Sequence, residues 1–135
     1  MPPANPSSAD DSLGKNLRHM ALTTSAEKLG FSADDEFPEV YGVLVDWPID
    51  NQTVASILAM RNGTSSLYSN STFGVIGGEA HAPIRQAARH CVRIAADCLA
   101  SSEPVADYQL PTRPSVYFYL LTYGGVRRCA GVEAG

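Results

Sequence analysis

The chain has 135 residues, of which 44% are hydrophobic and 18% charged, and a formal net charge of -4. This length fits one domain with its own hydrophobic core. The acidic balance argues against broad nucleic-acid binding, which needs a clear basic surface. No apolar run approaches the roughly 20 residues that cross a bilayer, and no signal-peptide pattern is visible. We therefore expect a cytoplasmic protein without nucleic-acid or membrane partners.

Three cysteines are present, Cys91, Cys98 and Cys129. The first two lie about 10 Å apart along the axis of an expected helix, whereas a disulfide needs Cα atoms within about 7 Å. The three histidines show no metal-ligand spacing among themselves or with the cysteines. These patterns predict reduced, buried thiols, no metal site and no cofactor.

The N-terminal part divides into a tail and a short helix. Residues 1–12 are rich in Pro, Ser, Ala and Asp, and a segment of this composition is expected to be a disordered tail. We expect residues 13–135 to form a single domain. A short first helix is indicated by apolar residues at helical spacing, namely Leu13, Leu17, Met20 and Ala21.

A second helix start is indicated by Thr24 and Glu27, which have the spacing of a capping box, with Gly30 suited to a helix end. Residues 34–36, Asp-Asp-Glu, then predict a solvated acidic connector.

Three strands are expected between residues 41 and 78. Residues 41–47 and 54–60 have strand patterns, and a third strand starts near Leu67, is interrupted at 69–71 and resumes at 73–76. The pair Asn62-Gly63 predicts a hairpin, because both residues tolerate the positive φ angles of a type I′ turn.

A long helix and a hairpin complete the chain. The helix is expected over residues 82–100, with Pro83 in its first turn, and residues 116–122 and 126–132 are strands around Gly124-Gly125. The helix carries one apolar stripe of mostly small residues, namely Ile84, Ala87, Ala88, Cys91, Ile94, Ala95, Cys98 and Leu99. The sequence thus predicts an α+β fold: a single five-stranded antiparallel sheet in the order β-β-β-α-β-β, one long helix packed on one face, and a short N-terminal helix.

The most concentrated charge feature is a stripe on the long helix. His81, Arg85, Arg89 and Arg93 are spaced four apart and therefore share one helix face. This stripe is interpreted as a partner-binding face for an acidic protein or for the chain's own acidic N-terminal part. An ordinary solvated face is the alternative.

The Gly77-Gly78 pair leads into the start of the same helix, where free N–H groups can hold an anion. The segment lacks the lysine of a phosphate loop, and Glu79 would repel a phosphate. A tight strand-to-helix turn is the favoured interpretation, with anion binding as the alternative.

Catalytic residues are not assigned. Asp46 lies in the middle of a strand and would act as a general base if it were buried, but the expectation is that it faces solvent or bonds to a neighbouring turn. The nucleophile pattern Gly-x-Ser-x-Gly is absent. An enzyme that uses Asp46 or His81 is therefore the least favoured of three hypotheses.

The order of elements over residues 41–132 resembles the profilin-like folds, including the roadblock and longin families. The runs 41–46 (Tyr-Gly-Val-Leu-Val-Asp), 74–79 (Gly-Val-Ile-Gly-Gly-Glu) and 117–125 look like an uncharacterised bacterial domain family without an assigned activity. The roadblock resemblance implies a homodimeric scaffold that regulates small GTPases or motors, and it transfers no site residues.

We therefore expect a non-enzymatic protein-binding, scaffold or regulatory domain, whose partner is another protein or a second copy of itself, joined through a strand edge or a helix face. The second hypothesis is a small-ligand sensor with a pocket between helix and sheet, and the third is a hydrolase-type enzyme.

Overall fold

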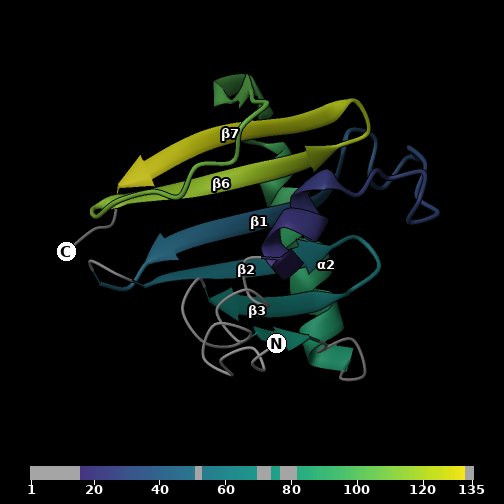
Figure 1. Ribbon diagram of the computed structural model, residues 1–135. Coiled ribbons are helices and arrows are strands. Elements are labelled where there is room, and N and C mark those ends of the chain that lie inside the picture. Colours follow the sequence, from purple (N-terminus) through teal and green to yellow (C-terminus); the bar gives the residue numbers. More distant parts are fainter. Residues whose placement is uncertain (1–15, 51–52, 70–73, 77–81, 133–135) are drawn as a thin grey trace, which may run out of the picture.

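The computed structural model describes residues 16–50, 53–69, 74–76 and 82–132 (Figure 1). These residues form an α+β fold with one open antiparallel sheet and two helices. The helices are a segment at residues 16–23 and α2 at Ala82–Ala96, followed by a short 3-10 helix, η1, at Leu99–Ser101. The strands are β1 Val40–Pro48, β2 Val54–Met60, β3 Ser65–Ser69, β4 Gly74–Ile76, β5 Glu103–Pro104, β6 Ser115–Thr122 and β7 Gly125–Val132.

The strands follow the order β4-β3-β2-β1-β6-β7-β5 across the sheet. Strand β1 lies at the centre, where Val45 pairs with Ile57 of β2 and with Phe118 of β6. The expected five strands are roughly matched, and β4 and the short β5 are the two additional strands. The expected interrupted third strand is two antiparallel strands, β3 and β4, because the intervening sequence is rich in Ser and Asn, which favour turns. Strand β5 adds only a two-residue pairing at the edge of β7.

A helix covers part of each face of the sheet (Figure 1). Neighbouring residues in a strand point to opposite faces, so the continuously apolar central strands supply two cores. On the α2 face, the core includes Val43, Ala59, Leu120, Ala88, Val92 and Ala95. On the opposite face, under the N-terminal helical segment 16–23, it includes Leu44, Leu58, Tyr119, Ala21 and Leu22.

Two turns differ from the expectation. Residues 24–30 form turns and not a second helix, because so short a segment cannot offset the cost of helix nucleation. The hairpin between β2 and β3 forms as expected, but among the described residues only glycines have positive φ, and Gly63 has a φ of 92°. The turn is therefore not type I′, which needs positive φ at Asn62 as well.

Helix α2 is shorter than expected and is rotated relative to the expected apolar stripe. It ends at Ala96, not at Ala100. Its sheet-facing residues are Ala88, Val92 and Ala95, whereas Cys91 and Ile94 are exposed. The rotation leaves an apolar flank of the helix outside the core.

Candidate functional site

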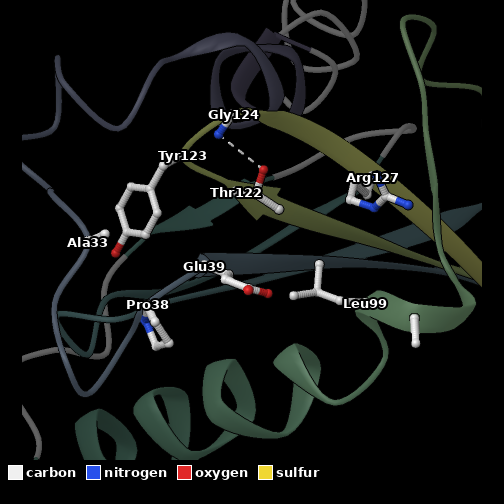
Figure 2. Close-up of a pocket in the computed structure, with 9 residues that line it drawn as sticks. Ala33, Pro38, Glu39, Leu99, Thr122, Tyr123, Gly124 and Arg127 are labelled. Atoms are coloured by element: carbon white, nitrogen blue, oxygen red, sulfur yellow. Dashed lines mark hydrogen bonds between the residues drawn. The ribbon is translucent and has the colours of Figure 1, made fainter.

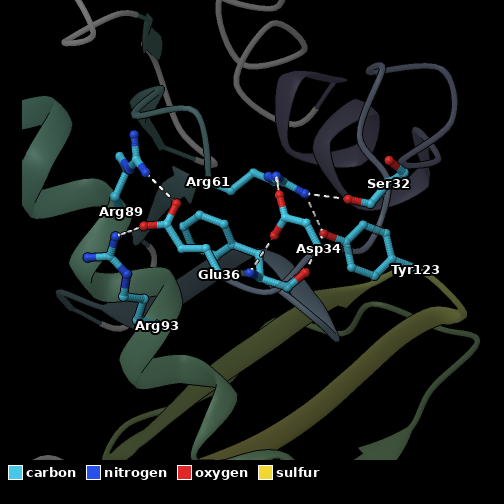
Figure 3. Close-up of polar contacts among 8 residues, drawn as sticks. Ser32, Asp34, Glu36, Arg61, Arg89, Arg93 and Tyr123 are labelled. Atoms are coloured by element: carbon cyan, nitrogen blue, oxygen red, sulfur yellow. Dashed lines mark hydrogen bonds and ion pairs between the residues drawn. The ribbon is translucent and has the colours of Figure 1, made fainter.

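An acidic segment crosses one end of the sheet and is held there by arginines. Residues 31–39, called the strap below, lead into β1. Arg61 binds two groups of the strap: Nη2 forms an ion pair with Asp34, and Nη1 donates a hydrogen bond to the carbonyl oxygen of Ser32 (2.6 Å) (Figure 3). Nη1 also donates to the hydroxyl of Tyr123 (2.7 Å), which follows β6. The acidic connector is thus attached to the end of β2, not only solvated.

The second contact of the strap is with α2. Glu36 accepts hydrogen bonds from Nη2 of Arg89, at 2.5 Å, and from Nη2 of Arg93 (Figure 3). All three side chains remain partly exposed, so the ion pairs are screened by solvent and salt. These contacts position the strap more than they stabilise it.

Phe37 anchors the strap by burial. Its ring lies beneath the guanidinium groups of Arg61, Arg89 and Arg93, at 5.0, 5.8 and 5.6 Å from the ring centre. Such cation–π contacts are geometrically favourable. The hydroxyl of Tyr123 donates to the Phe37 carbonyl oxygen at 2.8 Å. A buried aromatic ring therefore fixes the segment that the surface ion pairs orient.

Two carboxylates of the strap, those of Asp34 and Glu36, have lowered pKa values. The hydrogen bond from the Phe37 backbone N–H is the main cause that lowers the pKa of Asp34, and Arg61 adds to it. For Glu36, the hydrogen bond from Arg93 is the main cause of the lowered pKa. Both carboxylates are therefore ionised at neutral pH and keep the strap attached.

The expected partner-binding residues are placed only in part. Arg89 and Arg93 contact the chain's own acidic strap, so a second acidic partner would have to displace Glu36. Arg85 lies in α2, and His81 lies outside the described residues, so their roles stay predictions. The expected anion-binding turn, Gly77-Gly78, also lies outside the described residues.

A cavity of about 520 Å³ opens between the strap, η1 and the β6–β7 turn (Figure 2). It is lined by Ala33, Pro38, Glu39, Leu99, Ala100, Thr122, Tyr123, Gly124 and Arg127. Its size falls within the range of about 300–1,000 Å³ that is usual for small-molecule sites. Sequence reasoning did not find these residues, because they come from three separate segments and form no motif.

Asp46 is fully buried, and the expectation that it faces solvent or a turn is wrong. It accepts a hydrogen bond of 2.6 Å from Nη2 of Arg18, two of 3.2 Å from Nε of Arg18, and one of 2.5 Å from the Ser56 hydroxyl. The N-terminal helical segment supplies both the cover and the counter-charge. Since both carboxylate oxygens are engaged, the arrangement is a buried ion pair without an open position for a substrate.

An apolar surface lies where α2 leaves its side of the sheet uncovered. Trp47, Ile57 and Leu67 are 43%, 40% and 38% exposed, and Ile94, on the flank of α2 opposite the arginines, is 51% exposed. Ile57 pairs directly with Leu67 and lies diagonally across from Trp47. These four residues are called the apolar face below.

The sequence patterns around the apolar face predicted buried residues, not an exposed surface. The alternation over residues 41–47 indicated a strand with at least one buried face, which includes Trp47, and Ile94 fitted the apolar stripe of the helix. The apolar face is exposed because α2 is short relative to the sheet: neither described helix reaches the end of β1 that carries Trp47 (Figure 1).

The comparisons with known proteins gave no match among family models, curated proteins or solved structures. Among the residues that the structure describes, no three His, Cys, Asp or Glu side chains gather in a way that would hold a metal ion. Within the same part of the chain, no helix has the length and apolar character to cross a membrane.

Proposed function

We propose that the chain is a non-enzymatic, cytoplasmic protein-binding or scaffold domain that forms a homodimer through its apolar face. The observation that carries this proposal is the exposure of three neighbouring sheet residues, Trp47, Ile57 and Leu67, together with that of Ile94 on α2. We also propose that the chain is related to the profilin-like or roadblock-like folds, and the only support for this relationship is the order of strands and helices along the chain.

The apolar face is large enough to matter for association. If a fully exposed large apolar side chain offers on the order of 200 Å², the four residues expose roughly 350 Å² together. Exposed apolar patches of roughly 300–600 Å² are often functional in monomeric proteins. Burying such a surface is favourable in proportion to its area.

The lack of charge in the apolar face is compatible with a second copy as the occupant. Two copies with a net charge of -4 repel each other at long range, where salt screens the repulsion, and a contact without charged groups adds no close like-charge pair to it. The only charged residue in β1 is Asp46, which points to the opposite face, and β2 and β3 contain none. A two-fold axis would place this uncharged surface against itself.

The alternative contact surfaces are weaker. The described edge strands β4 and β5 have three and two residues, and Pro104 lies in β5. Short edges and proline both oppose edge-to-edge pairing. Arg89 and Arg93 are engaged by the strap, and β5 pairs with only two residues of β7, so the rest of the outer edge of β7 remains as the competing contact surface.

Sedimentation equilibrium of the wild type and two variants tests the proposal. Ile57→Lys places a charge in the apolar face, and Met20→Lys places the same charge at a 59% exposed site on the N-terminal helical segment. We expect a dimer for the wild type and for Met20→Lys, and a monomer with an unchanged circular dichroism spectrum for Ile57→Lys. A monomeric wild type at high concentration, or a folded Ile57→Lys dimer, contradicts the proposal.

A small-ligand sensor is the second candidate function, because the cavity beside the strap has the size of a ligand site. A thermal-shift screen with nucleotides, acyl acids and aromatic and amino-acid metabolites tests it. We expect at least one class to raise the melting temperature, since a ligand that binds only the folded state stabilises it. A screen without any shift contradicts this candidate.

A further inference from the structure

The cavity beside the strap contains two opposite charges that do not neutralise each other. Glu39 is exposed, and its carboxylate has no hydrogen bond or ion pair with any residue that the structure describes. Arg127 lines the same cavity from β7, and these two side chains form no ion pair within the described part of the chain. Figure 2 shows the Glu39 carboxylate, just before β1, directed towards Leu99, with Arg127 on β7, which β6 separates from β1.

Arg127 is held in place and keeps free donors. Its Nε donates to the Ser102 hydroxyl at 2.8 Å, and its Nη2 donates to the Ser102 carbonyl oxygen at 2.7 Å. A guanidinium has five N–H donors, so three have no acceptor among the residues that the structure describes. An immobilised guanidinium loses less side-chain entropy when it binds a ligand.

The other polar side chains of the cavity are already satisfied. The Tyr123 hydroxyl accepts from Arg61 and donates to the Phe37 carbonyl oxygen. The Thr122 hydroxyl donates to the carbonyl oxygen of Gly125 and accepts from the N–H of Gly124. Recognition of a polar ligand in this cavity therefore falls to Glu39 and Arg127.

We propose that the cavity binds a small zwitterion of the α-amino-acid type, with its ammonium group at Glu39 and its carboxylate at Arg127. This inference rests on the small-ligand function proposed above. A purely anionic ligand would meet Glu39 and a purely cationic one would meet Arg127, so both are disfavoured. The guanidinium fork matches a carboxylate geometrically, and Pro38 and Leu99 give an apolar wall for the ligand's side chain.

Isothermal titration calorimetry with the individual proteinogenic L-amino acids tests the inference. The best binder is then compared with its N-acetyl derivative, which lacks the ammonium group, and with its amide, which lacks the carboxylate. We expect both derivatives to bind about tenfold more weakly or worse, because each loses a charge-assisted hydrogen bond.

Matched variants locate the site. Glu39→Gln removes the free carboxylate from the cavity, and Glu27→Gln removes an exposed carboxylate elsewhere. We expect Glu39→Gln to weaken the binding of the amino acid about tenfold or more while leaving that of the N-acetyl derivative unchanged, and Glu27→Gln to change neither. Arg127→Lys keeps the charge but loses the fork, and we expect it to weaken the binding of the amino acid more than that of the amide.

The outcomes separate this inference from the function on which it rests. If no L-amino acid binds at millimolar concentration while another class of metabolite raises the melting temperature, the zwitterion inference is overturned and the ligand-sensor function stands. If no compound of any class binds, both are overturned. Equal affinity for the amino acid and its two derivatives, or for the wild type and Glu39→Gln, also overturns the inference.

Discussion

Replacing Arg18 with methionine should show how much the buried ion pair contributes to the fold. Arg18→Met keeps an unbranched apolar stem but removes every guanidinium donor. Asp46, which is 0% exposed, would then keep one described side-chain donor, the Ser56 hydroxyl. Breaking a buried ion pair costs about 3–5 kcal/mol. Because the Arg18 side chain is 13% exposed, solvent relieves part of this cost, and we expect the lower end, about 3 kcal/mol.

Urea unfolding followed by the fluorescence of Trp47, the only tryptophan, measures this loss. The protein concentration is kept constant, because self-association would make stability depend on it. Lys28→Met, which removes an exposed cation, is the control, and the double variant Arg18→Met/Asp46→Asn should recover part of the loss, since no unpaired charge remains buried. If Arg18→Met costs no more than Lys28→Met, the reasoning about this ion pair is refuted.

Three further predictions concern packing and charge. Gly42→Ala should destabilise by about 1–3 kcal/mol through overpacking, because an added Cβ would lie 3.0 Å from a side chain of β6, whereas Gly124→Ala, with nothing within 4 Å, should be nearly neutral; equal urea midpoints would contradict this. Phe37→Ala should cost about 3–5 kcal/mol, and a loss in urea unfolding below about 1 kcal/mol would mean that Phe37 does not anchor the strap. The pKa of Glu36 is lowered by Arg93, so the stabilisation that its carboxylate contributes is present above the ordinary pKa of 4.5 and is lost as the pH falls through the lower pKa of the folded state. Glu36→Gln should therefore lower the urea midpoint at neutral pH but not below that folded-state value, and a pH-independent difference would argue against the ion pair.

The elements of the fold could be predicted because each one has a local cause. The alternation of β1, the Gly124-Gly125 turn and the helical spacing of α2 depend only on neighbours in sequence. The extra strand β4 and the early end of α2 could not be predicted in the same way. Strand pairing and helix ends are decided by tertiary contacts as well as by local propensity.

The candidate sites are formed by residues that are far apart in the sequence, so most of them could not be predicted from sequence patterns. The sequence showed an arginine stripe and an acidic connector, and suggested that the two could meet, but it could not show that Arg61 also binds the connector. Nothing local marks Arg18 as the partner of Asp46, which lies 28 residues away. The cavity is assembled from three segments, and the apolar face arises only because α2 covers part of its side of the sheet.

Dilution of the protein, followed by the fluorescence of Trp47, tests the proposed homodimer most directly. Trp47 is the single tryptophan and belongs to the apolar face, so dimer formation would transfer its exposed part from water to an apolar contact. We expect the emission to shift to longer wavelength and acrylamide quenching to increase on dilution, and Ile57→Lys to show the dilute spectrum at every concentration. A spectrum that does not change with concentration, while sedimentation shows a dimer dissociating over the same range, would place the contact elsewhere and contradict the account.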